Sequence, residues 1–119
     1  MVRDMDLIRK ILLNVEAGNL HAGVEGYTDD AVNFHKALLV KKDLVEGTAN
    51  YPTGKDSRPD IPDLVMISRL TWDGHDLIQG IATDTKWSRV KAFLAESGKD
   101  LTIETIKWAV LHLFGAVVS

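Results

Sequence analysis

The feature that most limits the fold of this chain is a polar loop between two β-type runs. The loop spans 47–63, "GTANYPTGKDSRPDIPD", contains all three prolines of the chain and shows no apolar periodicity. The run "LVEGTAN" leads into it and the run "LVMISRL" follows it. Two strands joined by a polar loop make a β-hairpin, so the sequence predicts one hairpin over 44–70 with a long tip.

Segments with apolar residues at helical spacing lie on both sides of the hairpin. In the first of them, Leu7, Ile8, Ile11 and Val15 fall on one face of a helix. Hydroxyl residues such as Thr71 stand where helices would begin, which is typical of N-caps. The predicted helices cover 4–17, 29–43, 71–82, 84–97 and 102–116. This order of elements predicts an α+β fold, a single winged-helix-like domain over 1–119 (helices plus a β-hairpin wing) with two extra C-terminal helices.

The composition indicates a soluble globular protein. The 119 residues are 45% hydrophobic and 26% charged, which suits one domain with a core of its own. The absence of cysteine excludes disulfides, thiolate zinc sites and a cysteine nucleophile. No apolar run approaches the ~18 residues of a membrane span, and the N-terminus lacks the pattern of a signal peptide. We therefore expect a cytoplasmic protein that does not associate with membranes.

The stretch "TWDGHD" is the best candidate for catalysis, because His75 stands between two aspartates. Residues one or two apart on a helix do not face each other, however, so neither Asp73 nor Asp76 is well placed to orient His75. The histidines are dispersed, and the chain has no glycine-rich phosphate loop. We expect no catalytic centre, no cofactor and no required metal. Trp72 is predicted to cover the junction of strand and helix, and Gly74 to allow their close approach.

Nucleic-acid binding would depend on a few polar and basic residues. The candidate contacts are Asn33, Lys36, Lys41 and Lys42 on the second helix and Lys55 and Arg58 in the loop. Asp29 and Asp30 stand at the start of the same helix, where base-reading residues usually lie, and the net charge is −3. A charged face that contacts only solvent is the other explanation of these bases.

The last helix offers a different surface, suited to a protein partner. Its apolar residues cover most of its circumference, so it is either central to the core or shared with another chain, such as a second copy in a homodimer. An aromatic side chain in the loop would add an anchor of the kind that dominates protein interfaces. The predicted interface residues are Tyr51, Trp108, Leu111 and Phe114.

Four stretches of the chain resemble a known family. They are "RDMDLIRKILL", "FHKALLVKKDLVEG", "RLTWDGHDLI" and "DTKWSRVK". In order and spacing they resemble the domain-of-unknown-function family 2513 of bacteria and phages, over nearly the whole chain. The resemblance implies a relative of winged-helix proteins that is common in phages and prophages and has no established activity.

The segment "HKALLVKKDLVEG" is also similar to the part of arsenical-type repressors in which the recognition helix runs into the first strand of the wing. Those repressors usually have glycine where Asp43 stands, and aspartate tolerates the left-handed conformation of such a turn. They also need a full helix ahead of the recognition helix, for which "NLHAGVEGYT" is too rich in glycine. A stunted second helix would alter the geometry with which such proteins dock on DNA.

Two hypotheses of function follow. The first is a non-enzymatic, phage- or prophage-associated protein that binds a bacterial host protein as an inhibitor or adaptor. The alternative is a DNA-binding transcriptional regulator of a phage or prophage that uses the helix over 29–43 and the hairpin over 44–70. The acidic net charge and the pair Asp29 and Asp30 favour the protein partner, in the cytoplasm of a bacterial host.

Overall fold

The computed structural model describes residues 2–53 and 60–115, and in them two helices precede a β-hairpin and three helices follow it. The elements are α1 (Met5–Glu16), α2 (Asp29–Lys41), β1 (Val45–Asn50), β2 (Leu64–Leu70), α3 (Trp72–Ile81), α4 (Asp84–Glu96) and α5 (Ile103–Phe114). Each helix lies inside its predicted range. The predicted α+β class, with a winged-helix-like arrangement and extra helices at the C-terminal end, is confirmed.

The hairpin pairs β1 with β2 in antiparallel register. Asn50 lies opposite Leu64, next to the tip, and the register shifts by one residue between Glu46 and Gly47 because of a bulge. Side chains of a strand alternate between its two faces. Val65 and Ile67 of β2 accordingly point into the core, whereas Leu64 and Met66 are exposed on the outer face. The predicted hairpin is confirmed for its strands, and its tip over 54–59 lies outside the described residues.

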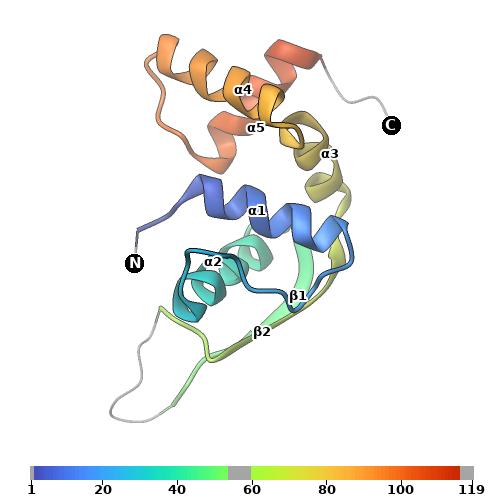
Figure 1. The fold of residues 1–119 in the computed structure, drawn as a ribbon, viewed down its shortest axis with the longest axis vertical. Helices are drawn as coiled ribbons and strands as arrows, with labels where there is room; N and C mark the ends of the chain where they lie inside the picture. Colours follow the sequence, from blue (N-terminus) through green and yellow to red (C-terminus); the bar gives the residue numbers. More distant parts are fainter. Residues whose placement is uncertain (1, 54–59, 116–119) are drawn as a thin grey trace.

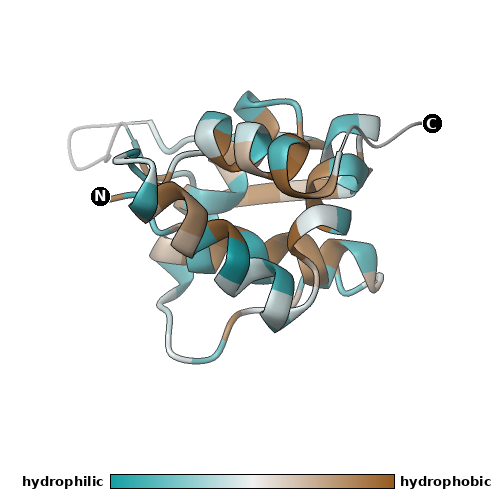
Figure 2. Ribbon diagram, turned by 90° about the horizontal axis from the view of Figure 1, so that it is seen from above, coloured by the Kyte–Doolittle hydropathy of each residue, from teal (hydrophilic) through white to brown (hydrophobic). Residues whose placement is uncertain are grey.

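Helix α1 runs through the middle of the molecule, between α2 with the hairpin on one side and α4 with α5 on the other (Figure 1). Its stripe of Leu7, Ile8, Ile11 and Leu12 is at most 1% exposed. Figure 2 shows the same distribution from above, with hydrophobic segments turned toward the centre and hydrophilic ones outward. Burial of this stripe against α2, β2 and α3 makes α1 the central element of the core.

The start of α1 is fixed by a buried histidine of α2. The backbone N–H of Asp4 donates to Nε2 of His35 over 2.8 Å, and Nδ1 of His35 lies 2.7 Å from the carbonyl oxygen of Ala31. A carbonyl oxygen can only accept, so Nδ1 carries the proton and Nε2 is the acceptor. Both ring nitrogens of this buried side chain therefore have structural partners.

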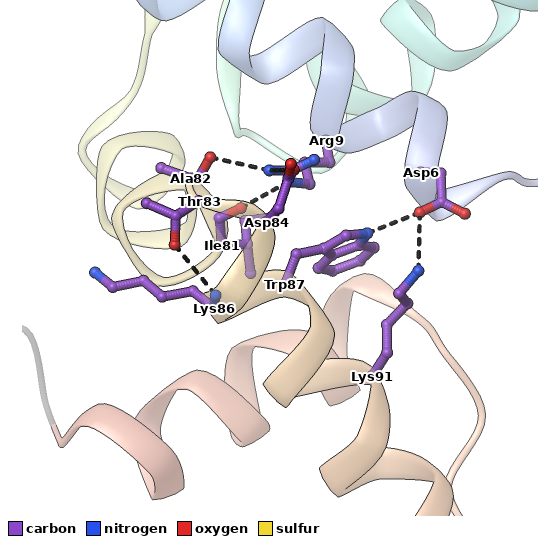
Figure 3. A network of polar contacts seen from close by, with 9 residues as sticks. All are labelled: Asp6, Arg9, Ile81, Ala82, Thr83, Asp84, Lys86, Trp87 and Lys91. Atoms are coloured by element: carbon purple, nitrogen blue, oxygen red, sulfur yellow. Dashed lines mark hydrogen bonds and ion pairs between the residues drawn. The ribbon is translucent and has the colours of Figure 1, made fainter.

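Helix α4 is tied to α1 by a polar network (Figure 3). The guanidinium of Arg9 donates to the carbonyl oxygens of Ile81 (2.7 Å) and Ala82 (2.9 Å), and its Nη2 lies 3.1 Å from a carboxylate oxygen of Asp84. The indole Nε1–H of Trp87 donates to Asp6 over 2.7 Å. These bonds fix the C-terminal end of α3 and the start of α4 against the central helix.

Residues 17–28, between α1 and α2, form turns and no helix, as the glycine-rich sequence predicts. The segment that would supply the second helix of a repressor-like domain is therefore an irregular connector. None of the described helices is long and apolar enough to cross a membrane.

Candidate functional site

The corner between β2 and α3 is held by the hydroxyl of Thr71. This residue is the N-cap of α3: its Oγ1 accepts the N–H of Gly74 over 3.0 Å and donates to the carbonyl oxygen of Asp43 over 2.6 Å. Its backbone N–H also donates to the carbonyl oxygen of Leu44. The start of α3 is thus bonded to the turn that joins α2 to β1.

A left-handed residue and a close approach of two backbone segments define this corner. Asp43 has a φ of 56°, the left-handed conformation that its place in the sequence predicts. At Gly74, a Cβ atom would lie 2.0 Å from the carbonyl oxygen of Leu44, so only glycine fits between the helix and the turn. The predicted role of Gly74 in a close approach is confirmed, and the corner is a rigid support for the side chains on it.

Trp72, the first residue of α3, projects outward from this corner. Its side chain is 83% exposed, and the prediction that it covers the junction of strand and helix is wrong. His75, one turn later, is also exposed, and its ring centroid lies 6.4 Å from that of Trp72 at an angle of 50°. A large aromatic side chain left in water on a rigid support is unusual for a residue that normally loses most of its exposure on folding.

A helical wheel of α3 would have revealed this exposure from the sequence. The buried residues Leu77, Ile78 and Ile81 define the inner face of the helix. Trp72 precedes Ile81 by nine positions, which is about two and a half turns at 3.6 residues per turn, so it lies on the opposite face. Because tryptophan is apolar, its position is readily interpreted as buried, although the helical spacing places it on the outer face.

Two shallow grooves flank Trp72. One, of about 580 Å³, lies toward the α2–β1 turn, and the other, of about 350 Å³, lies toward the strands. Glu46, Thr71 and Trp72 line both grooves. We call this surface the Trp72 face and define it by Asp43, Glu46, Arg69, Trp72, Asp73 and His75.

The charges of the Trp72 face are mainly acidic. Arg69 forms an ion pair of 3.1 Å with Glu46, and both side chains are largely exposed. Within the described residues, the carboxylates of Asp43 and Asp73 form no hydrogen bond or ion pair. The groove on the side of the α2–β1 turn is lined by three carboxylate residues and by no lysine, arginine or histidine. Its field therefore favours a positively charged partner group.

Among the predicted nucleic-acid contacts that the structure describes, the side chains do not form one exposed basic surface. Lys36 is only 7% exposed; its Nζ lies 3.4 Å from the carbonyl oxygen of Leu20, and burial lowers its pKa. The predicted nucleic-acid contact of Lys36 therefore lacks the exposed ammonium group that it needs, because this amine is directed at a carbonyl oxygen of the 17–28 connector.

The other predicted contacts on α2 differ in exposure and partners. Lys41 is exposed, whereas Lys42 forms an ion pair of 2.8 Å with Glu104 that lowers the pKa of this glutamate. Asn33 is partly buried, and its side-chain amide lies 3.4 Å from the carbonyl oxygen of Asp63. Lys55 and Arg58 lie outside the described residues.

The predicted protein-interface residues fall into two groups. Tyr51 is 49% exposed and Leu111 is 51% exposed. Trp108, in contrast, stacks on Phe93 of α4 with ring centroids 5.2 Å apart, and Phe114 lies beneath Arg89. Helix α5 therefore packs largely against other helices of the same chain. A hollow of about 280 Å³ between α3 and α5 is lined by Leu111 and Asp73, so that the exposed part of α5 adjoins the Trp72 face.

The sequence of this chain is similar to a known protein family and to a known bacterial protein. Residues 2–100 match the family described as "Hypothetical protein (DUF2513)". A Haemophilus influenzae (strain KW20 / Rd) protein described as "Uncharacterized protein" is 32% identical over 114 residues, covering 90% of each chain. No solved structure is significantly similar to the chain. The phage association and the cytoplasmic location stay predictions.

Proposed function

This chain belongs to the DUF2513 family, and we propose that it is a non-enzymatic, winged-helix-like binding protein that contacts another protein through the Trp72 face. The observation that carries the proposal is the 83% exposure of Trp72 on a corner fixed by backbone and hydroxyl bonds. Tryptophan is among the residues that contribute most to binding when a partner buries them.

The rigidity of the corner supports this proposal. A side chain presented from a fixed backbone loses little conformational freedom on binding, so most of the free energy of its burial contributes to affinity. The indole carries a large apolar area and lies between two grooves that a partner could fill. Met66 and Leu64 are further exposed apolar side chains, on the outer face of the hairpin.

The charges of α2 favour a protein over DNA as the partner. A recognition helix needs exposed donors and cations near its N-terminal end, where Asp29 and Asp30 stand in this chain. The burial of Lys36 and the ion pair of Lys42 leave little charge on α2 to neutralise phosphates. A DNA-binding regulator remains the competing hypothesis that the experiment must exclude.

Photo-crosslinking in a bacterium that expresses the chain tests the proposal. Trp72 is replaced by p-benzoylphenylalanine, and a matched variant carries the same photoreactive residue in place of Glu96, exposed on α4. We expect a discrete protein adduct from position 72 and none from position 96. Sequence-specific DNA binding in gel-shift titrations at physiological salt, with no adduct at position 72, would overturn the proposal.

A further inference from the structure

We infer that the Trp72 face takes a basic protein segment, with an arginine side chain lying against the Trp72 indole and beside the carboxylates of Asp43 and Asp73. This inference rests on the proposed function and specifies the chemistry of the partner. It concerns the groove on the side of the α2–β1 turn, which Trp72, Asp43, Glu46 and Asp73 line.

The other two tryptophans show how this chain surrounds an indole. Trp87 has the guanidinium of Arg9 at 6.0 Å and the ammonium of Lys91 at 5.4 Å from its ring centroid. Trp108 has the ammonium of Lys99 at 4.8 Å. No lysine or arginine from 2–53 or 60–115 stands over the Trp72 ring in this way. Among the described residues the face of the Trp72 indole is therefore open to a cation that a partner supplies.

The carboxylates beside the ring complete a site for a guanidinium. Asp43 and Asp73 are exposed and unpaired within the described residues, so they can accept N–H bonds without losing a partner. A guanidinium is planar: it can stack on the indole while its edge donates to a carboxylate, a combination that the compact ammonium of lysine does not offer. Like charges would repel an acidic segment or a phosphate backbone from the same groove.

Peptide titration followed by NMR tests this chemistry on the full chain. The probes are a hexa-arginine peptide, a hexalysine peptide and a hexaglutamate peptide. The indole N–H resonance of Trp72 is identified by its absence in the Trp72→Phe variant. We expect this resonance to move with hexa-arginine, less with hexalysine and not with hexaglutamate, while the indole resonances of Trp87 and Trp108 stay in place.

Matched charge variants separate a site from general attraction to an acidic protein. Asp43→Asn with Asp73→Asn should weaken hexa-arginine binding by about three- to ten-fold, and Trp72→Ala by a similar factor. Glu96→Gln with Asp100→Asn removes the same charge from exposed residues elsewhere and should change the Kd by less than about two-fold. Asparagine tolerates the left-handed backbone at position 43, so the first pair should fold.

Equal weakening by the two charge pairs, or hexa-arginine binding that leaves the Trp72 resonance unmoved, would overturn the inference. A protein adduct at position 72 would then persist, and the partner would have another chemistry. If the peptide results are as expected but no protein adduct forms at position 72, the proposed function fails instead. The two experiments are independent because the crosslinker reports contact of any chemistry, whereas the peptides report charge preference alone.

Discussion

Trp87 and Trp72 are the same residue type in the first turns of successive helices, but one side chain is buried and the other is exposed. Trp87 is 4% exposed, and its indole N–H is bonded to Asp6 of the central helix. Trp72 is 83% exposed, and its nearest aromatic neighbour is the ring of His75. Trp87 contributes area to the core, whereas the area of Trp72 is left for a partner.

The supports of the two side chains differ as well. Trp87 is held by contacts of its own ring with Asp6, Arg9 and Lys91. Trp72 is positioned by its backbone, through the bonds of Thr71 and the close approach of Gly74 to Leu44. Removing the ring should therefore damage one region and leave the other folded. This contrast makes the comparison testable.

The largest effect is expected for Trp87→Ala. Loss of a buried indole and of its hydrogen bond to Asp6 should lower the free energy of unfolding by about 3–5 kcal/mol. Trp87→Phe, which keeps most of the ring but removes the N–H donor, should be intermediate. Urea unfolding followed by circular dichroism measures both variants. If Trp87→Ala cost as little as a surface substitution, Trp87 would not hold α4 to α1.

Gly74→Ala should have the next largest effect on stability, because it disturbs the backbone contact that positions Trp72. The added methyl group would meet the carbonyl oxygen of Leu44 at 2.0 Å, which forces a shift of the backbone and costs about 1–3 kcal/mol. Gly23→Ala is the matched control, since nothing lies within 4 Å of a Cβ at that position. Similar melting temperatures for the two variants would show that the corner is not tightly packed.

The helices and strands and their ends could be predicted from the sequence, since they depend on residues that are close together in the chain. Apolar periodicity predicted each helix, and the turn chemistry of Asp43 and Thr71 predicted the ends of elements. The pairing of Trp87 with Asp6 joins residues 81 positions apart and follows only from the packing of α4 on α1. The burial of Lys36 likewise depends on the path of a connector that has no periodicity. Local patterns predicted the elements, while the burial of Lys36 and the partner of Trp87 required the assembled fold.

Acidification should weaken the Trp87 region by a small amount. The hydrogen bond from Trp87, with the charge of Lys91, holds the pKa of Asp6 below its ordinary value of 3.8, although partial burial opposes this. Ionised Asp6 therefore stabilises the folded chain above pH 3.8, and this contribution is lost as pH falls through 3.8 and the folded-state pKa. Because half of the Asp6 side chain is exposed, the loss should be about 0.5 kcal/mol or less.

Comparison of the wild type with Asp6→Asn isolates this contribution. Asparagine still offers Trp87 an oxygen acceptor but carries no charge, so the difference in stability between the two proteins should shrink between about pH 5 and pH 3. Asp100→Asn, at an exposed position of the α4–α5 connection, serves as a control for general effects of charge. A difference that grows on acidification would mean that the Asp6 carboxylate is not stabilised in the folded chain.

The smallest effect on stability is expected for Trp72→Ala, in direct contrast to Trp87→Ala. A ring that is already 83% in solvent buries little area on folding, so its removal should change the free energy of unfolding by no more than about 0.5 kcal/mol. The same substitution should abolish binding of the partner protein, which is identified in the separate crosslinking experiment with a photoreactive residue at position 72. An anchor residue contributes mainly to binding. Thermal unfolding and partner capture by the same purified variant measure the two quantities together. Stability lost in step with binding would mean that Trp72 packs within the fold after all, whereas binding lost from a fully stable chain would separate its role from that of Trp87.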